Sequence, residues 1–280
     1  MSVPGSHDLE TMRFTVSDGV ATVVLDHPPI NVFDLAMHGD LERVLDLLDV
    51  DEAVRVIVIE SAHSEFFVAH YDVGAILAED TGTVRTTSGA FNVLMRRLRS
   101  GNYVTIAKIR GAARGGGCEL ALACDLRFAA TEQARFGFPE VALGILAAGG
   151  ATQRLPALVG RPRALEMLLG CEDLTAEQAE RYQLVNRALP DAELDGFVAA
   201  LARRIAGHPA DAVGMTKLAV GVAEPEPDEA GFALEAMLLD LLKARPPARR
   251  RLARFLELGA QTESGEAEFA ALLARLADDR

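Results

Sequence analysis

The sequence predicts an α/β protein in which crossover helices join parallel strands, followed by a helical C-terminal region. Up to about residue 190, short apolar runs rich in β-branched residues alternate with segments of helical periodicity, and this alternation is typical of parallel sheets. Beyond residue 207 only helical segments are expected. The chain has 280 residues, of which 50% are hydrophobic and 25% charged, so it can bury a large core.

The strands are predicted from local composition. Asp18-Gly19 separates two β-rich runs and favours a hairpin, because both residue types tolerate the positive φ angles of a two-residue turn. The run 54–59 is mostly apolar, as in a strand that is buried on both faces. The expected strands cover residues 14–16, 20–25, 54–59, 103–109, 126–130 and 135–138.

Helices are predicted from apolar residues at helical spacing. The apolar residues from Leu41 to Leu48 share one helix face, and Thr175 and Gln178 have the spacing of a capping box at a helix start. The expected helices before residue 207 cover residues 37–48, the second part of 82–100, 118–123, 161–169, 175–182 and 194–205.

The C-terminal quarter differs from the rest of the chain. Its expected helices cover residues 208–222, 231–244, 248–258 and 266–276, and an acidic loop with two prolines joins the first two. A region of this size buries little surface by itself, so it packs on the main domain or on another subunit. We therefore divide the chain into a core domain, 1–207, and a helical oligomerisation region, 208–280.

Charge and cysteine content exclude several classes of protein. The net charge of −13 disfavours nucleic acid and anionic membrane surfaces as partners. The three cysteines, Cys118, Cys124 and Cys171, form no CxxC pair, which argues against a disulfide framework or a zinc site, and we expect no metal. Neither a secretory signal nor a membrane-spanning run is evident, so we expect a cytoplasmic protein.

A glycine-rich segment, 114–120, lies between an expected strand and an apolar helix. Three consecutive glycines, residues 115–117, allow the backbone to approach a ligand closely, and the following helix N-terminus offers free N–H groups. Such groups suit a carbonyl oxygen that gains negative charge during a reaction. The alternative is a tight strand-to-helix turn that needs glycine only for a positive φ angle.

Two glutamates are candidates for proton transfer. Glu119 follows the glycines among apolar neighbours, and Glu140 stands alone in a second apolar stretch. A buried carboxylate has a raised pKa and can exchange protons near neutral pH. The alternatives are that Glu119 only complements the helix dipole and that Glu140 is an ordinary acid of a surface loop.

A third segment, 66–72, follows a strand and could bring further N–H groups to the same place. It contains His70. For this single histidine the favoured interpretation is a side chain that is hydrogen-bonded within a loop.

Several ordered motifs run through nearly the whole chain. They are Pro29-Ile-Asn-Val-Phe33, Phe67-Val-Ala-His-Tyr-Asp72, Gly111 to Leu120 with Cys124-Asp125, Phe136-Gly-Phe-Pro-Glu140 with Leu143-Gly144, and Gly150 to Leu155. At these residues the chain resembles the crotonase family, also called the enoyl-CoA hydratase/isomerase superfamily. Together the motifs are far more specific than any one of them.

The resemblance implies a spiral of ββα units with two roughly perpendicular sheets, followed by a C-terminal helical region. It implies homotrimers or dimers of trimers, and an acyl-CoA thioester as substrate, with coenzyme A as part of that substrate and no other cofactor. By motif position, the backbone N–H groups of Tyr71 and Gly116 form the oxyanion hole. The further positions implied to bind substrate are Val68, Ala69, His70, Gly115 and Ala148.

The reaction implied is the hydration of a trans-2-enoyl-CoA to a 3-hydroxyacyl-CoA through an enolate-like transition state, as part of fatty acid metabolism. Hydratases of the family use two glutamates, and both positions are glutamate here: Glu119 takes a proton from water and Glu140 delivers one to Cα. Two alternatives stay open. One is another crotonase reaction, isomerisation of the double bond or decarboxylation, and the other is a protein that binds acyl-CoA without turnover.

The chain departs from the family pattern at two places near the site. His70 stands where the family usually has glycine, and Ala147-Ala148 stand where Pro-Gly is common. The basic residues between Lys243 and Arg254 could bind the CoA phosphates, although a solvated helix face is the preferred interpretation.

Overall fold

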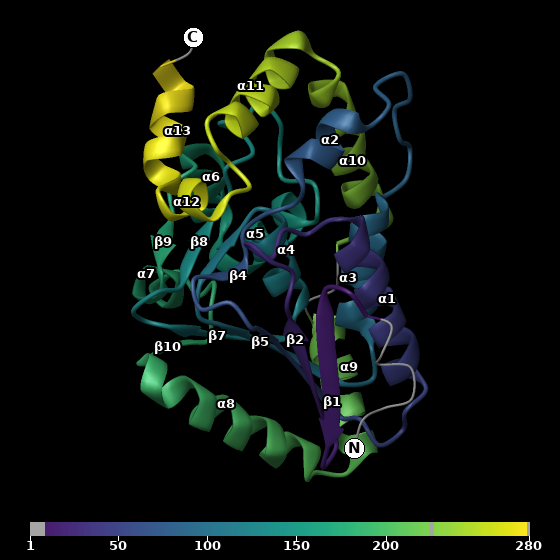
Figure 1. Ribbon diagram of the computed structural model, residues 1–280. Helices are drawn as coiled ribbons and strands as arrows, with labels where there is room; N and C mark the ends of the chain where they lie inside the picture. Colours follow the sequence, from purple (N-terminus) through teal and green to yellow (C-terminus); the bar gives the residue numbers. More distant parts are fainter. Residues whose placement is uncertain (1–8, 224–226, 279–280) are drawn as a thin grey trace.

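The computed structural model describes residues 9–223 and 227–278 (Figure 1). Residues 1–8, where no signal sequence is expected, and part of the acidic loop lie outside this range. Two sheets form the centre. The larger sheet contains β1 (Met12–Ser17), β2 (Val20–Leu25), β3 (Val56–Ser61), β5 (Val104–Ile109), β7 (Leu126–Ala130) and β10 (Arg187–Leu189), in that order. The smaller sheet contains β4 (Phe66–Val68), β6 (Ala112–Arg114), β8 (Arg135–Gly137) and β9 (Leu174–Thr175).

The chain alternates between these sheets, which makes the fold a spiral. β3, β5 and β7 pair in parallel in the larger sheet, and the strand that follows each of them, β4, β6 or β8, pairs in parallel in the smaller one. A helix then returns the chain for the next turn. The expected spiral of ββα units is confirmed.

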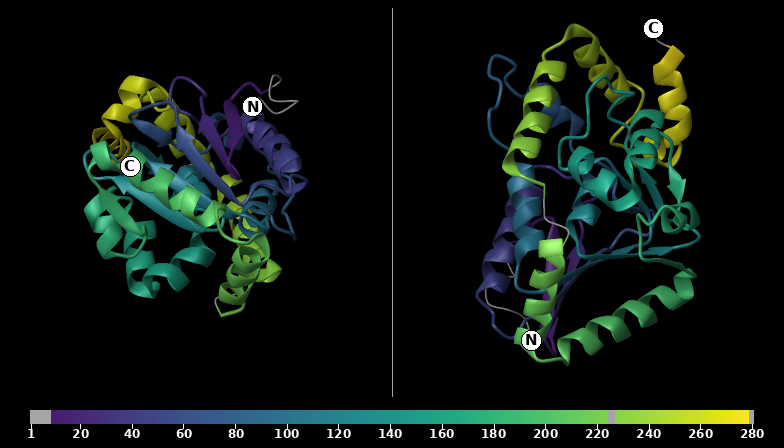
Figure 2. Two further views of the ribbon diagram at one scale, coloured as in Figure 1. Left: turned by 90° about the horizontal axis from the view of Figure 1, so that it is seen from below. Right: turned by 180° about the vertical axis from the view of Figure 1, so that it is seen from behind.

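Helices of the core pack against the two sheets and against one another. They are α1 (Leu35–Asp49), α2 (Val73–Ala78), α3 (Ala90–Ser100), α4 (Gly116–Ala123), α5 (Ala151–Val159), α6 (Arg161–Gly170), α7 (Ala176–Arg181) and α8 (Asp191–Ala206). α8 packs on the outer face of the larger sheet, where Leu194 and Val198 contact Val56 and Phe128 in one apolar cluster (Figures 1 and 2).

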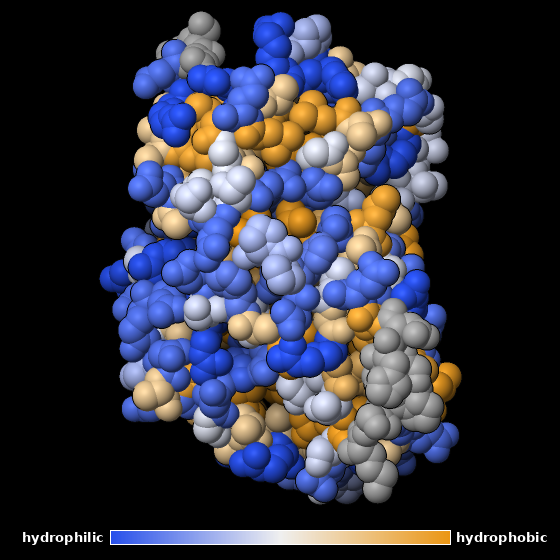
Figure 3. All heavy atoms as spheres, viewed as in Figure 1, coloured by the Kyte–Doolittle hydropathy of each residue, from blue (hydrophilic) through white to orange (hydrophobic). Residues whose placement is uncertain are grey.

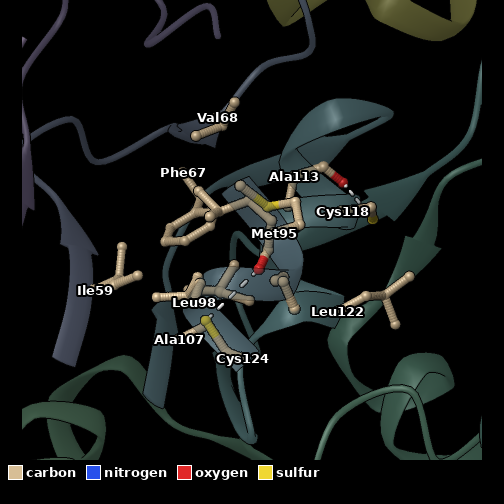
Figure 4. Close-up of a cluster of buried hydrophobic side chains, with 14 of the residues drawn as sticks. Ile59, Phe67, Val68, Met95, Leu98, Ala107, Ala113, Cys118, Leu122 and Cys124 are labelled. Carbon is tan, nitrogen blue, oxygen red and sulfur yellow. Dashed lines mark hydrogen bonds between the residues drawn. The ribbon is translucent and has the colours of Figure 1, made fainter. Parts of the chain in front are cut away.

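The main hydrophobic core lies between the two sheets, around α4. Figure 4 shows side chains from strands of both sheets and from two helices meeting there, among them Ile59, Phe67, Met95 and Leu122. All eight residues of α4 are buried. Any polar side chain on this helix is therefore held in an apolar environment.

Local signals in the sequence produce the predicted elements. Asp18 and Gly19 have φ angles of 51° and 77°, and they connect the antiparallel strands β1 and β2, which confirms the hairpin. Thr175 and Gln178 form the capping box at the start of α7. The apolar face of α1 is buried as predicted.

Two helices were not predicted, and one predicted helix is divided. α2 is only six residues long. α5 begins after Gly150, which has a φ of 108°, and contains Pro156, so turn and helix-breaking residues hide its periodicity. The predicted helix 266–276 is two helices, α12 (Glu263–Ala267) and α13 (Phe269–Asp278).

The helices of the C-terminal region follow α8, and the division of the chain at residue 207 stays a prediction. The region contains α9 (Ala210–Ala223), α10 (Glu229–Lys243), α11 (Pro246–Glu257), α12 and α13. α11 packs on α2, and Phe255 shares an apolar cluster with Val73 and Leu143 of the core. Figure 3 shows an apolar area over these helices, at the upper end of the molecule. An oligomerisation role for residues 208–280 stays a prediction.

α9 differs from the other long helices, because it buries none of its residues. Its exposed apolar side chains include Met215, Leu218, Val220 and Val222. In residues 9–223 and 227–278, no helix combines the length and the apolar character that a membrane span requires.

Two leucines of α1 provide a test of the core packing. Leu45 is fully buried, whereas Leu35 is 74% exposed. Leu45→Ala should lower the free energy of unfolding by about 2–5 kcal/mol, because it removes buried methyl groups and leaves a cavity. Leu35→Ala should change it by less than about 0.5 kcal/mol. Denaturant unfolding measures both, and equal effects would contradict this packing.

Candidate active site

The glycine-rich turn between β6 and α4 forms the floor of the candidate site. Gly115 has a φ of 46° and its N–H donates to Gly137 O. A Cβ atom on Gly115 would lie 2.3 Å from Glu140 Oε1, and one on Gly116 would lie 3.3 Å from Tyr71 N. The turn thus needs glycine for its backbone angle, and it also brings the backbone close to two predicted site residues.

Two backbone amides face each other at this turn. The Tyr71 segment is fixed by a short parallel bridge, in which Phe33 N–H donates to His70 O and Asp72 N–H donates to Phe33 O. Tyr71 N–H itself, and Gly116 N–H in the first turn of α4, donate to no atom among the described residues. The structure therefore brings together the two predicted oxyanion-hole donors.

Glu119 projects from the first turn of α4 and is only 4% exposed. Its Oε1 accepts hydrogen bonds from Gly149 N–H at 2.6 Å and from Ala151 N–H at 3.1 Å. These amides belong to the start of α5. Glu119 thus lies between the N-termini of two helices, where partial positive charge favours a carboxylate.

Glu140 lies in the turn that follows β8. Its backbone carbonyl accepts from Leu143 N–H and Ile145 N–H, both at 3.0 Å. The side-chain Oε2 is buried and has no hydrogen-bond partner among the described residues. The alternative that Glu140 is an ordinary surface acid is therefore wrong, since its carboxyl group is turned inward beside Gly115.

Burial raises the pKa of both carboxyl groups. For Glu119, the charges of Glu140 and Glu235 raise the pKa further, and the two amide hydrogen bonds oppose the rise. For Glu140, burial outweighs the opposing effect of a backbone hydrogen bond and of the His70 charge. The pair therefore holds a proton at higher pH than ordinary glutamates do, as general acid–base chemistry near neutrality requires.

Glu235 on α10 is another buried carboxylate, whose charge acts on Glu119, and the sequence analysis did not identify it. It is 1% exposed. Its Oε1 accepts from Thr152 Oγ1 at 2.5 Å, and its Oε2 accepts from Asn92 Nδ2 at 3.4 Å. The signal was available, because Glu235 is the one acid in the apolar run 232–239, as Glu119 is in its own helix.

The other predicted positions lie around the same turn. Val68 and Ala69 are fully buried, and Ala69 N–H donates to Ile30 O at 3.3 Å. Ala148 O accepts from Asn92 Nδ2 at 2.8 Å. Val68, Ala69 and Ala148 thus contribute backbone rather than reactive side chains to this part of the fold.

His70 is buried, and both ring nitrogens have partners. Nδ1 lies 2.8 Å from Tyr71 O, and Nε2 lies 2.9 Å from Glu266 Oε1 on α12. The interpretation of His70 as a hydrogen-bonded loop histidine is confirmed. Neither nitrogen is free to contact a ligand in this arrangement.

The basic stretch of α10 and α11 is tied to the protein itself. Lys243 is 3% exposed and forms ion pairs with Glu79 and Asp240. Arg249 donates to Leu77 O and Arg251 to Leu276 O, both at 3.0 Å. The preferred interpretation as a solvated helix face is therefore wrong for Lys243, because α10 packs on the core.

An apolar cavity of about 320 Å³ opens beside Glu140. Ala147, which precedes α5, and Ala164, Leu165 and Leu168 of α6 are among the other residues that line this cavity. A larger cavity, about 1220 Å³, lies against α9 and contains none of the predicted site residues. Among the described residues, no group of His, Cys, Asp and Glu has the arrangement of a metal site.

Comparisons with known proteins identify the family of the chain. The family model of enoyl-CoA hydratase/isomerase matches residues 15–262. The 2,3-dehydroadipyl-CoA hydratase of Escherichia coli (strain K12) is 34% identical over 239 residues, which cover 85% of this chain and 92% of that protein. A short-chain-enoyl-CoA hydratase of Clostridium acetobutylicum is 33% identical over 202 residues, 72% of this chain and 77% of that protein.

Solved structures agree as well. A crystal structure from Streptomyces avermitilis, assigned to the enoyl-CoA hydratases, superposes with a TM-score of 0.86 at 37% sequence identity, and the match covers 96% of this chain and 99% of that one. The spiral fold and the matched motifs define a crotonase. The chain belongs to the enoyl-CoA hydratase/isomerase family of enzymes.

The raised pKa of Glu119 has a consequence for stability. The folded state binds this proton more tightly than the unfolded chain does, so the free energy of unfolding falls as pH rises above the ordinary range of a glutamate, about 4–5. Glu119→Gln removes this loss. It should stabilise the protein by about 1–2 kcal/mol at pH 8 and by progressively less toward pH 5.

Denaturant unfolding at both pH values measures this effect. Glu172→Gln, at an exposed position, is the matched control and should change neither value. A Glu119→Gln protein that is less stable than the wild type at pH 8 would contradict the assignment of a costly buried carboxylate.

Proposed function

We propose that the protein hydrates trans-2-enoyl-CoA thioesters to 3-hydroxyacyl-CoA. The observation that carries the proposal is the placement of two buried carboxyl groups, Glu119 and Glu140, beside two backbone amides that have no partner in the protein. Relatives named as enoyl-CoA hydratases, at 33–34% identity, support the same reaction. A protein that only bound acyl-CoA would have no use for two such costly carboxyl groups.

In this proposal the thioester carbonyl oxygen accepts hydrogen bonds from Tyr71 N–H and Gly116 N–H. Negative charge grows on this oxygen as water adds to the double bond. Both donors are fixed before the reaction, and α4 begins at Gly116, so its dipole favours that charge. In acyl-transfer enzymes the loss of one such donor costs about 3–4 kcal/mol.

The two carboxyl groups divide the proton transfers. The pair of acids holds one proton, and the proposal assigns it to Glu140, whose Oε2 has no hydrogen-bond partner among the described residues. Glu119 is assigned the ionised form, because two amide hydrogen bonds oppose the effect of burial on its pKa. Water lies between the two carboxyl groups. Glu119 removes one proton from water, the oxygen bonds to the β-carbon, and Glu140 delivers its proton to the α-carbon on the same face.

The acyl chain extends into the apolar cavity beside Glu140. Its lining is almost entirely hydrophobic, with Ala164, Leu165 and Leu168 on one side, so it suits a hydrocarbon chain. The proposal includes a homotrimer or a dimer of trimers, for which the exposed apolar side chains of α9 supply contact surface. It includes no cofactor besides the coenzyme A of the substrate.

Replacing either acid by its amide tests the chemistry. Glu119→Gln and Glu140→Gln should each lower kcat for crotonyl-CoA about 10²–10⁴-fold, because each removes one proton-transfer step. The loss of the conjugated-thioester absorbance measures the rate. Glu172→Gln should retain wild-type kcat.

Two outcomes would contradict the proposal. Full hydration activity in either variant would remove the assigned role of that residue. A wild-type protein that isomerises 3-enoyl-CoA but hydrates no 2-enoyl-CoA would establish a different reaction of the same family.

Filling the cavity tests the position of the acyl chain. Ala164 is buried on α6 and lines the same cavity as Glu140. Ala164→Phe should lower kcat/KM for trans-2-decenoyl-CoA about tenfold or more while kcat/KM for crotonyl-CoA changes less than about threefold, because only the longer chain needs this space. Equal losses for both substrates would place the chain elsewhere.

A further inference from the structure

The loop that carries the Tyr71 amide is held by residues almost two hundred positions later in the chain. Gln261 Oε1 accepts from Val73 N–H at 3.1 Å, and Gln261 Nε2 donates to Asp72 Oδ1 at 3.0 Å. Glu266 Oε1 lies 2.9 Å from His70 Nε2. Gln261 and Glu266, which we call the C-terminal clamp, thus hold the chain on both sides of Tyr71.

The contacts of His70 define its charge. Nδ1 faces Tyr71 O and Nε2 faces the carboxylate of Glu266. Since a carbonyl oxygen and a carboxylate only accept hydrogen bonds, both ring nitrogens donate, and the ring is an imidazolium. Burial alone lowers the pKa of His70, but the hydrogen bond and charge of Glu266 outweigh it, so the pKa is raised.

Other charged groups surround this pair. Arg114 Nη1, from β6, lies 3.6 Å from Glu266 Oε2, and Arg114 is itself paired with Asp173. The charge of His70 also acts on Glu140. It lowers the pKa of Glu140, although the larger effect of burial raises it. The ring of Phe255, 5.9 Å from the imidazole, covers the pair with apolar surface.

Both members of the pair are shielded from solvent. His70 is 4% exposed and Glu266 is 1% exposed. A buried ion pair is weak evidence for stability, since desolvation offsets much of its attraction. Its contacts favour a role in geometry and electrostatics instead, because it joins the oxyanion loop to a distant helix and places a fixed positive charge near Glu140.

We propose that His70 and Glu266 are positioning residues of the active site: the ion pair fixes the loop that presents the Tyr71 amide and holds a positive charge beside Glu140. The proposal rests on the proposed function, because it assigns the amide to the thioester oxygen. Under this proposal, the oxyanion hole is complete only while α12 is packed against the loop that carries Tyr71.

Glu266→Gln is the direct test, since the amide keeps the size and hydrogen-bonding oxygen of the side chain but removes its charge. The kcat for crotonyl-CoA should fall about 10–100-fold with KM changed less than about threefold, because a misplaced donor acts on the transition state. Glu268→Gln, at an exposed position two residues after Glu266, is the matched control and should behave as the wild type.

The pH profile separates a positioning role from a merely structural one. Without the charge of Glu266, burial and the charge of Arg114 lower the pKa of His70, so the imidazole becomes neutral and the positive charge that favours ionised Glu140 is lost. The pKa of Glu140 then rises. The alkaline limb of the kcat/KM profile, where Glu140 loses its proton, should move to higher pH. The other groups that face Glu140, namely Glu119, Cys118 and Cys171, are unchanged in the variant. Lower activity at every pH with an unmoved limb would overturn the proposal.

A binding measurement keeps this proposal distinct from the proposed function. A β-ketoacyl-CoA binds as its enolate where two donors meet the thioester oxygen, and the enolate absorbs in the near ultraviolet. Glu266→Gln should weaken enolate binding about tenfold and leave binding of saturated butanoyl-CoA unchanged. If the wild type fails to hydrate but the variant shows this loss, the positioning role stands and the hydratase function fails.

The reverse combination of results would separate the two proposals as well. If the wild type hydrates crotonyl-CoA and Glu266→Gln matches it in kcat, pH profile and enolate affinity, the positioning role fails and the function stands. Should Glu266→Gln fold poorly by circular dichroism, His70→Gln with Glu266→Gln replaces the ion pair by a neutral pair. This double variant should fold and still show the loss in kcat, and full activity in it would overturn the proposal.

Discussion

The candidate site depends on the two hydrogen bonds that support the buried carboxylate of Glu119. Glu119 lies on a helix with no exposed face, and the donors that compensate its charge are amides at the start of α5. Those amides are in place only because the spiral brings α4 and α5 together beside the glycine-rich turn. The fold thus converts a destabilising burial into a group whose pKa suits proton transfer.

The parts that could be predicted from sequence are governed by local signals. Asp18-Gly19, the Thr175 capping box and the strand runs each depend on neighbours in sequence, and the ordered motifs identified Glu119 and Glu140 as candidates. Glu266 could not be found in this way. Its significance comes from a contact with His70 across 196 residues, and no periodicity or spacing rule records a contact of that kind.

The groups proposed to attract the ligand act over short distances, whereas the net charge of the whole molecule opposes binding. The chain carries a net charge of −13, and coenzyme A is itself polyanionic, so the overall field opposes the proposed ligand. Several cations near the C-terminal helices, Lys243 among them, are already paired within the chain. Attraction for the ligand then has to come from fixed N–H groups and the positive end of a helix, which act over short distances.

The clamp also has a consequence for biosynthesis. Translation proceeds from the N-terminus, and domains form as their residues emerge. The glycine-rich turn and both catalytic candidates are made before residue 150, yet Glu266 is among the last fifteen residues of the 280. Under our proposal, the loop that carries Tyr71 therefore has no clamp in the nascent chain until Glu266 has been synthesised.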